Sequence, residues 1–421
     1  MSSWQPLLPP PVAGRALRVA EEIAHDLSRF QPRMAPQWGA ALASGAPGKA
    51  LFFAYLDQAL PDAGWGDRAA EALDEAFNHL ASAPATPDLY GGFTGLAWVL
   101  EHLQGWFLDE EEDAGGEIAL AVEKVLRAPW LDFDLLRGIA GVGVWALERS
   151  PRSGGGECLR RTVAYLAEMA DRRDGLIAWT TPADQVPPDR RDAFPQGFTF
   201  TGVAHGTAGV IALLGEAQAA GVATRPLLDG AVQWLLARKL SPEAPSFFPC
   251  ETADAIGSGV DYPRPTRLAW CHGDPGIAAA LLGAARRAGE PAWEREATAV
   301  ARAAALRSPA ETSVRDAGLC HGSAGLLHLF NRLYQATGDS ALAEAARFWF
   351  DRTLELRRPG AGLAGFQAWD IDEDGSLGWR DDPGFLGGAA GIGLALLAAA
   401  TPIEPAWDRV MLISIPDQPG T

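Results

Sequence analysis

The stretch Cys320-His321-Gly322-Ser323-Ala324-Gly325, followed by the apolar run 326–330, contains the pattern on which the fold depends. The same Gly-x-x-Gly step, again followed by an apolar run, begins at seven glycines: Gly45, Gly92, Gly138, Gly206, Gly273, Gly322 and Gly388. The intervals between these first glycines are 47, 46, 68, 67, 49 and 66 residues. Such self-similarity indicates a repeat architecture in which each repeat contributes one supersecondary unit.

Segments with two different helical patterns flank the steps. The runs after the steps, such as 277–282 and 392–397, are apolar on almost every side, which is typical of buried helices. The more polar segments before the steps have helical periodicity, clearest at 15–30, 67–80, 157–170 and 341–356. Seven pairs of outer and inner helices bury the inner set most economically as a closed ring of helix hairpins. We therefore predict one domain over residues 1–421, with an insertion at about 174–200.

Composition limits the class of protein further. Hydrophobic residues make up 48% and charged residues 21% of the 421 residues, as in ordinary globular chains. The formal charge of −18 argues against a nucleic-acid partner, although it is compatible with attracting a basic peptide. We expect neither a membrane span nor a signal peptide, because no apolar stretch is long enough and no basic-then-apolar block begins the chain. Four cysteines do not make a disulfide scaffold in so long a chain, which favours a cytoplasmic location.

Cysteine and histidine gather at three of the steps. The relevant stretches are His205-Gly206, with a histidine in place of a cysteine, Trp270-Cys271-His272-Gly273 and Cys320-His321-Gly322. Two thiolates and one imidazole from Cys271, Cys320 and His321 would leave one open position on a tetrahedral zinc ion, as in catalytic sites. A thiol that enters this position would be held as a thiolate, which favours thiol addition or alkylation. The alternative is two buried cysteines and a core histidine.

Other local motifs have competing interpretations. The glycines of each step are expected to allow tight turns and close approach of neighbouring inner helices, whereas a phosphate-binding loop lacks its lysine and its βαβ context. The stretch Asp370-x-Asp372-x-Asp374-Gly375, with Asp381 beyond it, is either the start of a calcium loop or a polar turn. His328 lies on an apolar helix face and is expected to be a core histidine. Cys158 and Cys250 lie outside the pattern and are expected to be unreactive.

The chain resembles the lanthionine synthetase C-like family, the cyclases of lanthipeptide and lantibiotic biosynthesis. The resemblance covers nearly the whole chain and is most specific at His205-Gly206-x-x-Gly209, Arg267-x-x-Trp270-Cys271-x-Gly273 and Gly318-Leu319-Cys320-His321-Gly322. It implies an all-α fold, a double α/α toroid of seven inner and seven outer helices with a zinc ion. It also implies a Michael-type addition of cysteine thiols to dehydroalanine or dehydrobutyrine in a precursor peptide, which forms lanthionine or methyllanthionine thioether rings.

The resemblance also assigns roles to individual residues. Cys271, Cys320 and His321 would be the zinc ligands. His205 would be the catalytic acid or base, and Asp134 would orient its imidazole and favour its charged form. Arg267 would stabilise negative charge on the enolate. The competing interpretations are a core or capping role for His205, a helix cap for Asp134 and an ordinary ion pair for Arg267.

The resemblance further implies the partners of the chain. The substrate would be a dehydrated precursor peptide, made by a separate dehydratase, since no further domain large enough for dehydration is apparent. Two other functions remain open. One is a non-catalytic scaffold of the same fold that binds a peptide or glutathione. The other is a different zinc-dependent thiol-alkylating enzyme, for which a basic cluster for diphosphate would be expected and is not seen beside the motifs.

Overall fold

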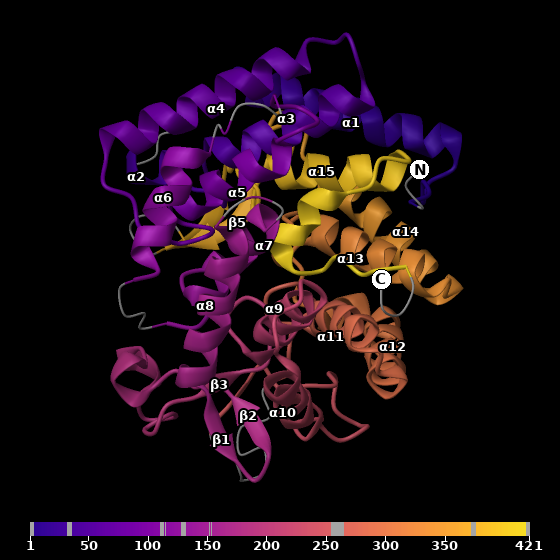
Figure 1. The fold of residues 1–421 in the computed structure, drawn as a ribbon. Coiled ribbons are helices and arrows are strands. Elements are labelled where there is room, and N and C mark those ends of the chain that lie inside the picture. The colour runs from indigo at the N-terminus through magenta and orange to yellow at the C-terminus, as the bar shows by residue number, and fades with distance from the viewer. Residues whose placement is uncertain are drawn as a thin grey trace. The chain divides into compact units, whose positions relative to one another are not determined.

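The computed structural model of the chain describes residues 4–31, 36–109, 113, 115–127, 132–150, 152, 154–253, 265–371 and 376–417. Within these ranges the protein contains fifteen α-helices and three small antiparallel sheets of two strands each (Figure 1). Among the same residues, no helix combines the length and apolarity needed to cross a membrane.

Seven helices begin directly after the first glycine of a step. They are α3 (Ala46–Ala59), α5 (Phe93–Leu103), α7 (Ile139–Arg149), α9 (Thr207–Ala219), α11 (Asp274–Ala288), α13 (Ser323–Thr337) and α15 (Ala389–Ala400). Most of their residues are buried on all sides; in α15 every residue is buried. These are the predicted inner helices, and each of the seven glycines is the N-cap residue of its helix.

Seven further helices bury only one face. They are α1 (Pro10–Leu27), α4 (Trp65–Ser82), α6 (Gly116–Val125), α8 (Gly155–Met169), α10 (Arg225–Leu236), α12 (Pro291–Leu306) and α14 (Ser340–Glu355). In α4, for example, the buried positions Ala69, Ala72, Leu73 and Ala76 recur at the three- and four-residue spacing of an amphipathic helix. The predicted outer segments 15–30, 67–80, 157–170 and 341–356 coincide with helices in the structure, within a few residues at their ends.

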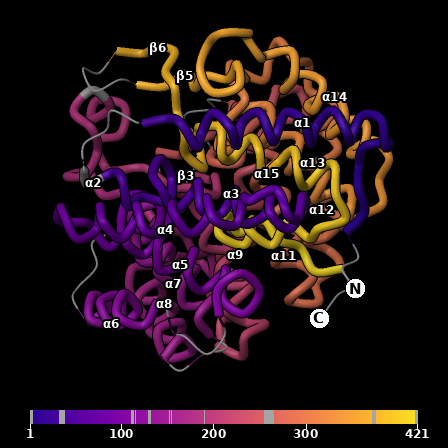
Figure 2. The backbone as a smooth tube through the Cα atoms, turned by 90° about the horizontal axis from the view of Figure 1, so that it is seen from above, coloured from indigo at the N-terminus to yellow at the C-terminus, as the bar shows by residue number. Residues whose placement is uncertain are grey.

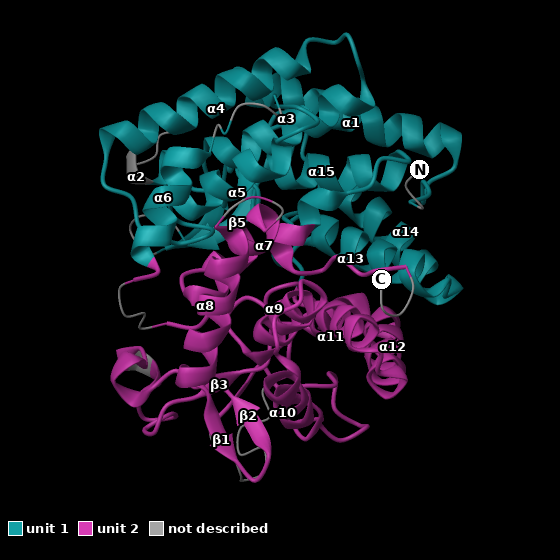
Figure 3. Cartoon of the chain, in the orientation of Figure 1, with its two compact units in different colours: residues 1–125, 314–408 teal, residues 126–313, 409–421 magenta. Residues whose placement is uncertain are grey.

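The chain folds into two compact units (Figure 3). Unit 1 comprises residues 1–125 and 314–408, and unit 2 comprises residues 126–313 and 409–421. The short helix α2 (Pro36–Gly39) packs on α4 in unit 1. The prediction of one domain over residues 1–421 with an insertion at about 174–200 stays a prediction.

Within each unit, most inner helices pack on the outer helix that follows them in the chain. The pairs are α3 with α4 and α13 with α14 in unit 1, and α7 with α8, α9 with α10 and α11 with α12 in unit 2. The last inner helix of unit 1, α15, packs instead on α1, and Figure 2 shows the two helices side by side. The Trp4 indole nitrogen donates to the Ala398 carbonyl over 2.8 Å, which fastens the start of the chain to α15.

The glycines of the steps allow the chain to fold back on itself. A Cβ atom on Gly325 would lie 2.0 Å from the Leu319 carbonyl oxygen, and one on Gly209 would lie 2.1 Å from the Val203 carbonyl oxygen. The second glycine of a step therefore makes room for the loop that precedes its own helix. This differs from the expected close approach of neighbouring inner helices, because the nearest atoms belong to the preceding loop.

Replacing Gly325 with alanine is therefore expected to destabilise the protein by about 1–3 kcal/mol, the usual cost of forcing an extra methyl group into a packed site. The measurement is the midpoint of urea unfolding. Gly378→Ala is the matched control, because no atom lies within 4 Å of a Cβ atom placed there. An unchanged midpoint in Gly325→Ala would contradict the steric explanation of the step.

Small elements interrupt the helices at three places. Between α8 and α9 lie the hairpin β1 (Asp171–Arg173) and β2 (Leu176–Ala178), the 3₁₀ turns η1 (Ala183–Gln185) and η2 (Pro188–Arg190), and β3 (Thr199–Phe200), which pairs with β4 (Glu251–Thr252). A further 3₁₀ turn, η3 (Pro309–Glu311), follows α12. In unit 1, β5 (Ala368–Ile371) pairs with β6 (Leu377–Arg380), and η4 (Ala406–Met411) begins in unit 1 and ends in unit 2.

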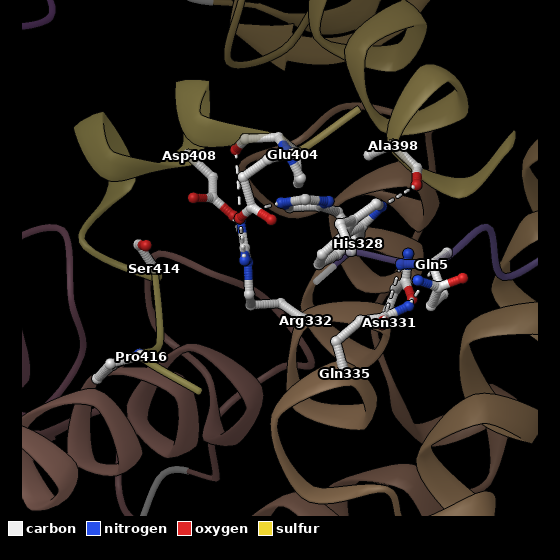
Figure 4. A network of polar contacts seen from close by, with 12 residues as sticks. Gln5, His328, Asn331, Arg332, Gln335, Ala398, Glu404, Asp408, Ser414 and Pro416 are labelled. Atoms are coloured by element: carbon white, nitrogen blue, oxygen red, sulfur yellow. Dashed lines mark hydrogen bonds and ion pairs between the residues drawn. The ribbon is translucent and has the colours of Figure 1, made fainter. Parts of the chain in front are cut away.

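His328 belongs to a buried polar network in unit 1 (Figure 4). Its Nε2 atom lies 2.8 Å from the Asp408 carboxylate, which also accepts a hydrogen bond of 2.9 Å from Nε of Arg332. Arg332 donates further to Glu404 over 2.7 Å and lies over the ring of Trp4, 4.6 Å from its centre. His328 is therefore the core histidine that the sequence predicts, and its network joins α13 to η4 and to the start of the chain.

This network predicts that stability falls as the pH is lowered. Burial lowers the pKa of His328, and despite its own burial the pKa of Asp408 is lowered by Arg332 and His328. Groups with depressed folded-state pKa values contribute stability that is lost on acidification, starting for histidine below the unfolded pKa of about 6.5. The urea midpoint of the wild type should therefore fall from pH 7 to pH 5.5, and that of His328→Gln should fall less. Equal shifts in both proteins would refute the assignment to His328.

Candidate metal centre and acid–base pair

Backbone hydrogen bonds connect the loops that precede the inner helices. In each loop the bonded residue stands two or three positions before the first glycine of the step. In unit 1, the Cys320 N–H donates to Leu386, the Leu386 N–H to Ala43 and the Ala43 N–H to Tyr90, over 2.9, 3.1 and 3.0 Å. These four residues hold the same position in their repeats. The backbone of Cys320 is therefore held by the same hydrogen-bonding pattern as the equivalent residues of the other repeats in unit 1.

The same connection in unit 2 defines the position of Cys271. The Ala204 N–H donates to the Cys271 carbonyl over 3.1 Å, and the Leu135 N–H donates to the Ala204 carbonyl over 3.2 Å. Ala204 thus corresponds to Cys271, so His205 corresponds to His272, one position before the glycine. The sequence predicts His205 at the position of the cysteines, and this prediction is wrong by one residue: Ala204 holds that position.

Cys320 and His321 lie in unit 1 directly before α13. The His321 Nε2 atom is 4.0 Å from the carboxylate of Asp316, which is buried. Asp316 also accepts backbone N–H groups from Gly318 at 3.1 Å and from Trp369 at 2.9 Å, so its side chain has a fixed direction. The 4.0 Å separation is longer than a hydrogen bond, so Asp316 is close to His321 without bonding its ring.

The surroundings of the two cysteines differ. Cys271 is buried at 6% exposure, and the neighbouring Trp270 is fully buried, with its indole nitrogen donating to the Met411 carbonyl over 2.9 Å. Cys320 is half-buried. Tyr90 is fully buried nearby in unit 1, and its pKa is raised well above 10 by burial and by the charge of Cys320. Tyr90 is therefore a neutral phenol near pH 7.

His205 and Asp134 form a close pair in unit 2. The Nδ1 atom of His205 is 2.5 Å from Oδ2 of Asp134, and the side chains are 30% and 8% exposed. The other oxygen of Asp134 accepts the N–H groups of Arg137 and Gly138 over 2.6 and 3.1 Å. Asp134 therefore holds the turn before α7 and contacts His205 at once, although no side chain caps α7 itself, and its role toward His205 stays a prediction. With Nδ1 occupied, Nε2 is the nitrogen that can act on a substrate.

His272 lies against His205. The ring centres are 5.4 Å apart and the planes are inclined by 22°. Burial lowers the pKa of His272 to about 4, with a smaller contribution of the same sign from Arg267. His272 is therefore neutral near pH 7, and the exposed side chain of Arg267 is close enough to influence it.

Phe200 is the residue that sequence reasoning missed. Its ring lies 4.6 Å from that of His272 and 6.1 Å from that of His205. The signal was present in the repeat: Phe200 stands six residues before Gly206, at the position that three other steps fill with aspartate, Asp132, Asp316 and Asp382. In those steps the aspartate accepts an N–H from the residue two positions on, so it organises the turn. Phe200 cannot accept such an N–H with its side chain, so its role differs from that of the aspartates.

The remaining candidates lie elsewhere. Cys158 is buried in α8 and Cys250 is half-buried beside β4; both remain thiols. Of the possible calcium loop, Asp372, Asp374 and Gly375 lie outside the described residues. Asp370 is part of β5 and pairs with Arg380 of β6, so strands flank this stretch where a calcium loop of the helix–loop–helix type needs helices.

The sequence matches the family of lanthionine synthetase C-like proteins over residues 36–412. Because this match spans most of the chain, the protein belongs to that family. The structure is similar to that of nisin cyclase, with a TM-score of 0.74 and 18% sequence identity, over 94% of this chain and 96% of that one. This similarity confirms the predicted all-α fold class, a double α/α toroid.

Two further solved structures are similar at a lower level. They are a sugar epimerase from a ruminal bacterium, with a TM-score of 0.48 and 9% identity, and a polysaccharide lyase, with a TM-score of 0.43 and 12% identity. Each match covers 92% of this chain, and 98% and 96% of the respective relative.

Proposed function

We propose that the protein is a zinc-dependent lanthipeptide cyclase. It adds cysteine thiols of a dehydrated precursor peptide to dehydroalanine or dehydrobutyrine, forming lanthionine and methyllanthionine rings. The observation that carries this proposal is the Asp134–His205 pair, built from the same kind of loop that presents the two cysteines. Membership of the lanthionine synthetase C-like family and the fold shared with nisin cyclase support the same class of reaction.

The donor atoms suit zinc. Cys271, Cys320 and His321 together offer two thiolates and one imidazole, a set that could bind a metal ion. Zinc prefers sulfur and nitrogen ligands, and three protein ligands leave one position for a substrate. Asp316, 4.0 Å from Nε2 of His321, is the nearby carboxylate that could support this histidine as a ligand after a small movement. When bound, the ion would lower the pKa of a substrate thiol and hold it as a thiolate.

Residues of the chain carry out the proton transfer. Asp134 accepts a hydrogen bond from Nδ1–H of His205, which leaves Nε2 to take the proton of the incoming thiol. The sulfur then bonds to the β-carbon of the dehydroamino acid, and the electrons of the double bond move towards the carbonyl as an enolate. His205 returns the proton to the α-carbon, so the reaction is an isomerisation with no net loss of atoms. Arg267 supplies positive charge for the enolate.

The same proposal defines the partners and the location. The substrate is a precursor peptide whose serine and threonine residues a separate dehydratase has already dehydrated. The net charge of −18 suits a peptide with basic residues. Cysteine chemistry of this kind needs thiols in reduced form, which fits a cytoplasmic enzyme.

The test combines elemental analysis of the purified chain with an assay on a dehydrated peptide that contains cysteine. Ring closure leaves the peptide mass unchanged, so the readout is the loss of thiols that N-ethylmaleimide can label. We expect one zinc ion per chain and enzyme-dependent loss of label. Binding of the peptide with every thiol still labelled, in zinc-loaded protein, would overturn the cyclase proposal and favour the non-catalytic scaffold.

A further inference from the structure

We propose that Phe200 and His272 are positioning residues that hold the imidazole ring of His205 in its working orientation. The inference rests on the proposed function, in which His205 moves the proton. It goes further because it assigns a task to two residues that make no bond to the substrate, and because it connects the site to the segment 182–198.

The contacts around His205 restrict its ring in two different ways. The hydrogen bond to Asp134 fixes one nitrogen in the plane of the ring, but the ring can still swing about that bond. His272 covers one face of the ring, nearly parallel at 5.4 Å, and thereby opposes this swing. Together the two contacts direct Nε2 to one place. Precise placement matters because a displacement of about 1 Å can cost about 100-fold in rate.

Phe200 packs beside both histidine rings, closer to His272 than to His205. Its ring is 4.6 Å from the His272 ring, and its backbone lies in β3, paired with Glu251 of β4. The next residue, Thr201, continues this pairing by donating its N–H to the Cys250 carbonyl over 3.2 Å. The pairing of β3 with β4 therefore fixes the backbone position of Phe200, from which its ring reaches His272.

Phe200 also packs against a small hydrophobic core formed by the segment 182–198. Val186, Phe194 and Phe198 are buried together, and Phe200 packs against them, with 4.7 Å between the rings of Phe198 and Phe200. Arg190 lies 4.6 Å from the centre of the Phe198 ring and bonds the buried carboxylate of Glu251 over 2.9 Å.

The rings thus form a continuous series from this core to the acid–base group. Phe198, Phe200, His272 and His205 follow one another at 4.7, 4.6 and 5.4 Å. In this proposal the core of the segment 182–198 supports the ring of His205 indirectly, through Phe200 and His272.

The experiment compares His272→Ala, His272→Phe and Phe200→Ala with the wild type. Phe247→Ala is the matched control, since Phe247 is another half-buried phenylalanine of unit 2, and its ring packs on Phe248. Two quantities are measured in zinc-loaded protein of known metal content: kcat and KM for thiol loss, and the line width of the His205 Nε2 signal by NMR of ¹⁵N-histidine-labelled protein.

We expect His272→Ala and Phe200→Ala to lower kcat by about 10- to 100-fold with little change in KM. The Nδ1–H tautomer should persist, because Asp134 still accepts from Nδ1, but the Nε2 signal of His205 should broaden as the ring samples more orientations. His272→Phe, which keeps a ring at this position, should restore both quantities, and Phe247→Ala should behave as the wild type. An unchanged kcat and an unchanged Nε2 line width in His272→Ala would overturn the proposal. If the wild type closes no rings, the Nε2 line width still tests the positioning role separately from the cyclase proposal.

Discussion

Replacing Cys320 with alanine is expected to remove the bound zinc and to reduce ring closure by at least about 1,000-fold. The reason is that, in the proposed mechanism, the metal would contribute several kcal/mol to the reaction and two thiolates would form most of its binding set. The measurements are zinc per chain by elemental analysis and the rate of thiol loss on the dehydrated peptide. The midpoint of urea unfolding should change little, because Cys320 is half-buried and its backbone hydrogen bond to Leu386 does not involve the side chain.

Two companion variants make this prediction specific. Cys158→Ala removes a thiol from the outer helix α8 and should keep both zinc and activity. Cys271→Ala should lose zinc as completely as Cys320→Ala, because the proposal assigns both cysteines to one ion. A Cys271→Ala protein that retained a full complement of zinc would show that the three residues do not share an ion, and the ligand assignment would have to be abandoned.

The starts of the inner helices could be predicted from the sequence because their cause is local. Each step needs glycine at two positions, since the preceding loop passes within about 2 Å of where a Cβ atom would lie, as at Gly209 and Gly325. Such a requirement appears in the sequence as glycine at the same two positions of every step. The outer helices could be predicted for a similar reason, because one buried face produces a regular apolar pattern.

The sequence did not reveal which helices pack together or what surrounds His205. Most inner helices pack on the outer helix that follows them, but α15 packs on α1, because contacts between distant segments decide the partner. The stack of Phe200 and His272 likewise depends on the pairing of β3 with β4, two strands of two residues each that are too short to produce a pattern. Only the departure from aspartate at position 200 hinted at it.

Asp134 and Asp132 illustrate why a residue type alone does not define a role. Both precede Gly138, and both accept backbone N–H groups in the same loop. Only Asp134 also contacts a histidine. Asp132 is largely buried, and its pKa is raised by that burial and by the negative charge of Asp134. The structure therefore distinguishes a carboxylate that organises the turn from one that also bonds the ring of His205.

Replacing His205 with alanine is expected to lower kcat by about 100- to 10,000-fold, the usual contribution of a general acid or base. Zinc content should remain that of the wild type, because His205 is not assigned to the metal. The measurements are the rate of thiol loss at saturating peptide and the zinc content of the same sample. Loss of zinc in His205→Ala would instead assign this histidine to the metal centre, and an unchanged rate would remove it from the mechanism.

Asp134→Asn tests how the pair works, because asparagine can preserve one function of this side chain and change the other. Its carbonyl oxygen can still accept the N–H groups of Arg137 and Gly138, so the turn and the urea midpoint should be nearly unchanged. Its amide group would then face Nδ1 of His205 with N–H donors, which disfavours the Nδ1–H tautomer. We expect kcat to fall by at least about 100-fold while the fold persists, as when a triad aspartate is replaced. Full activity in Asp134→Asn would mean that the carboxylate serves only as a cap, and that His205 acts without its help.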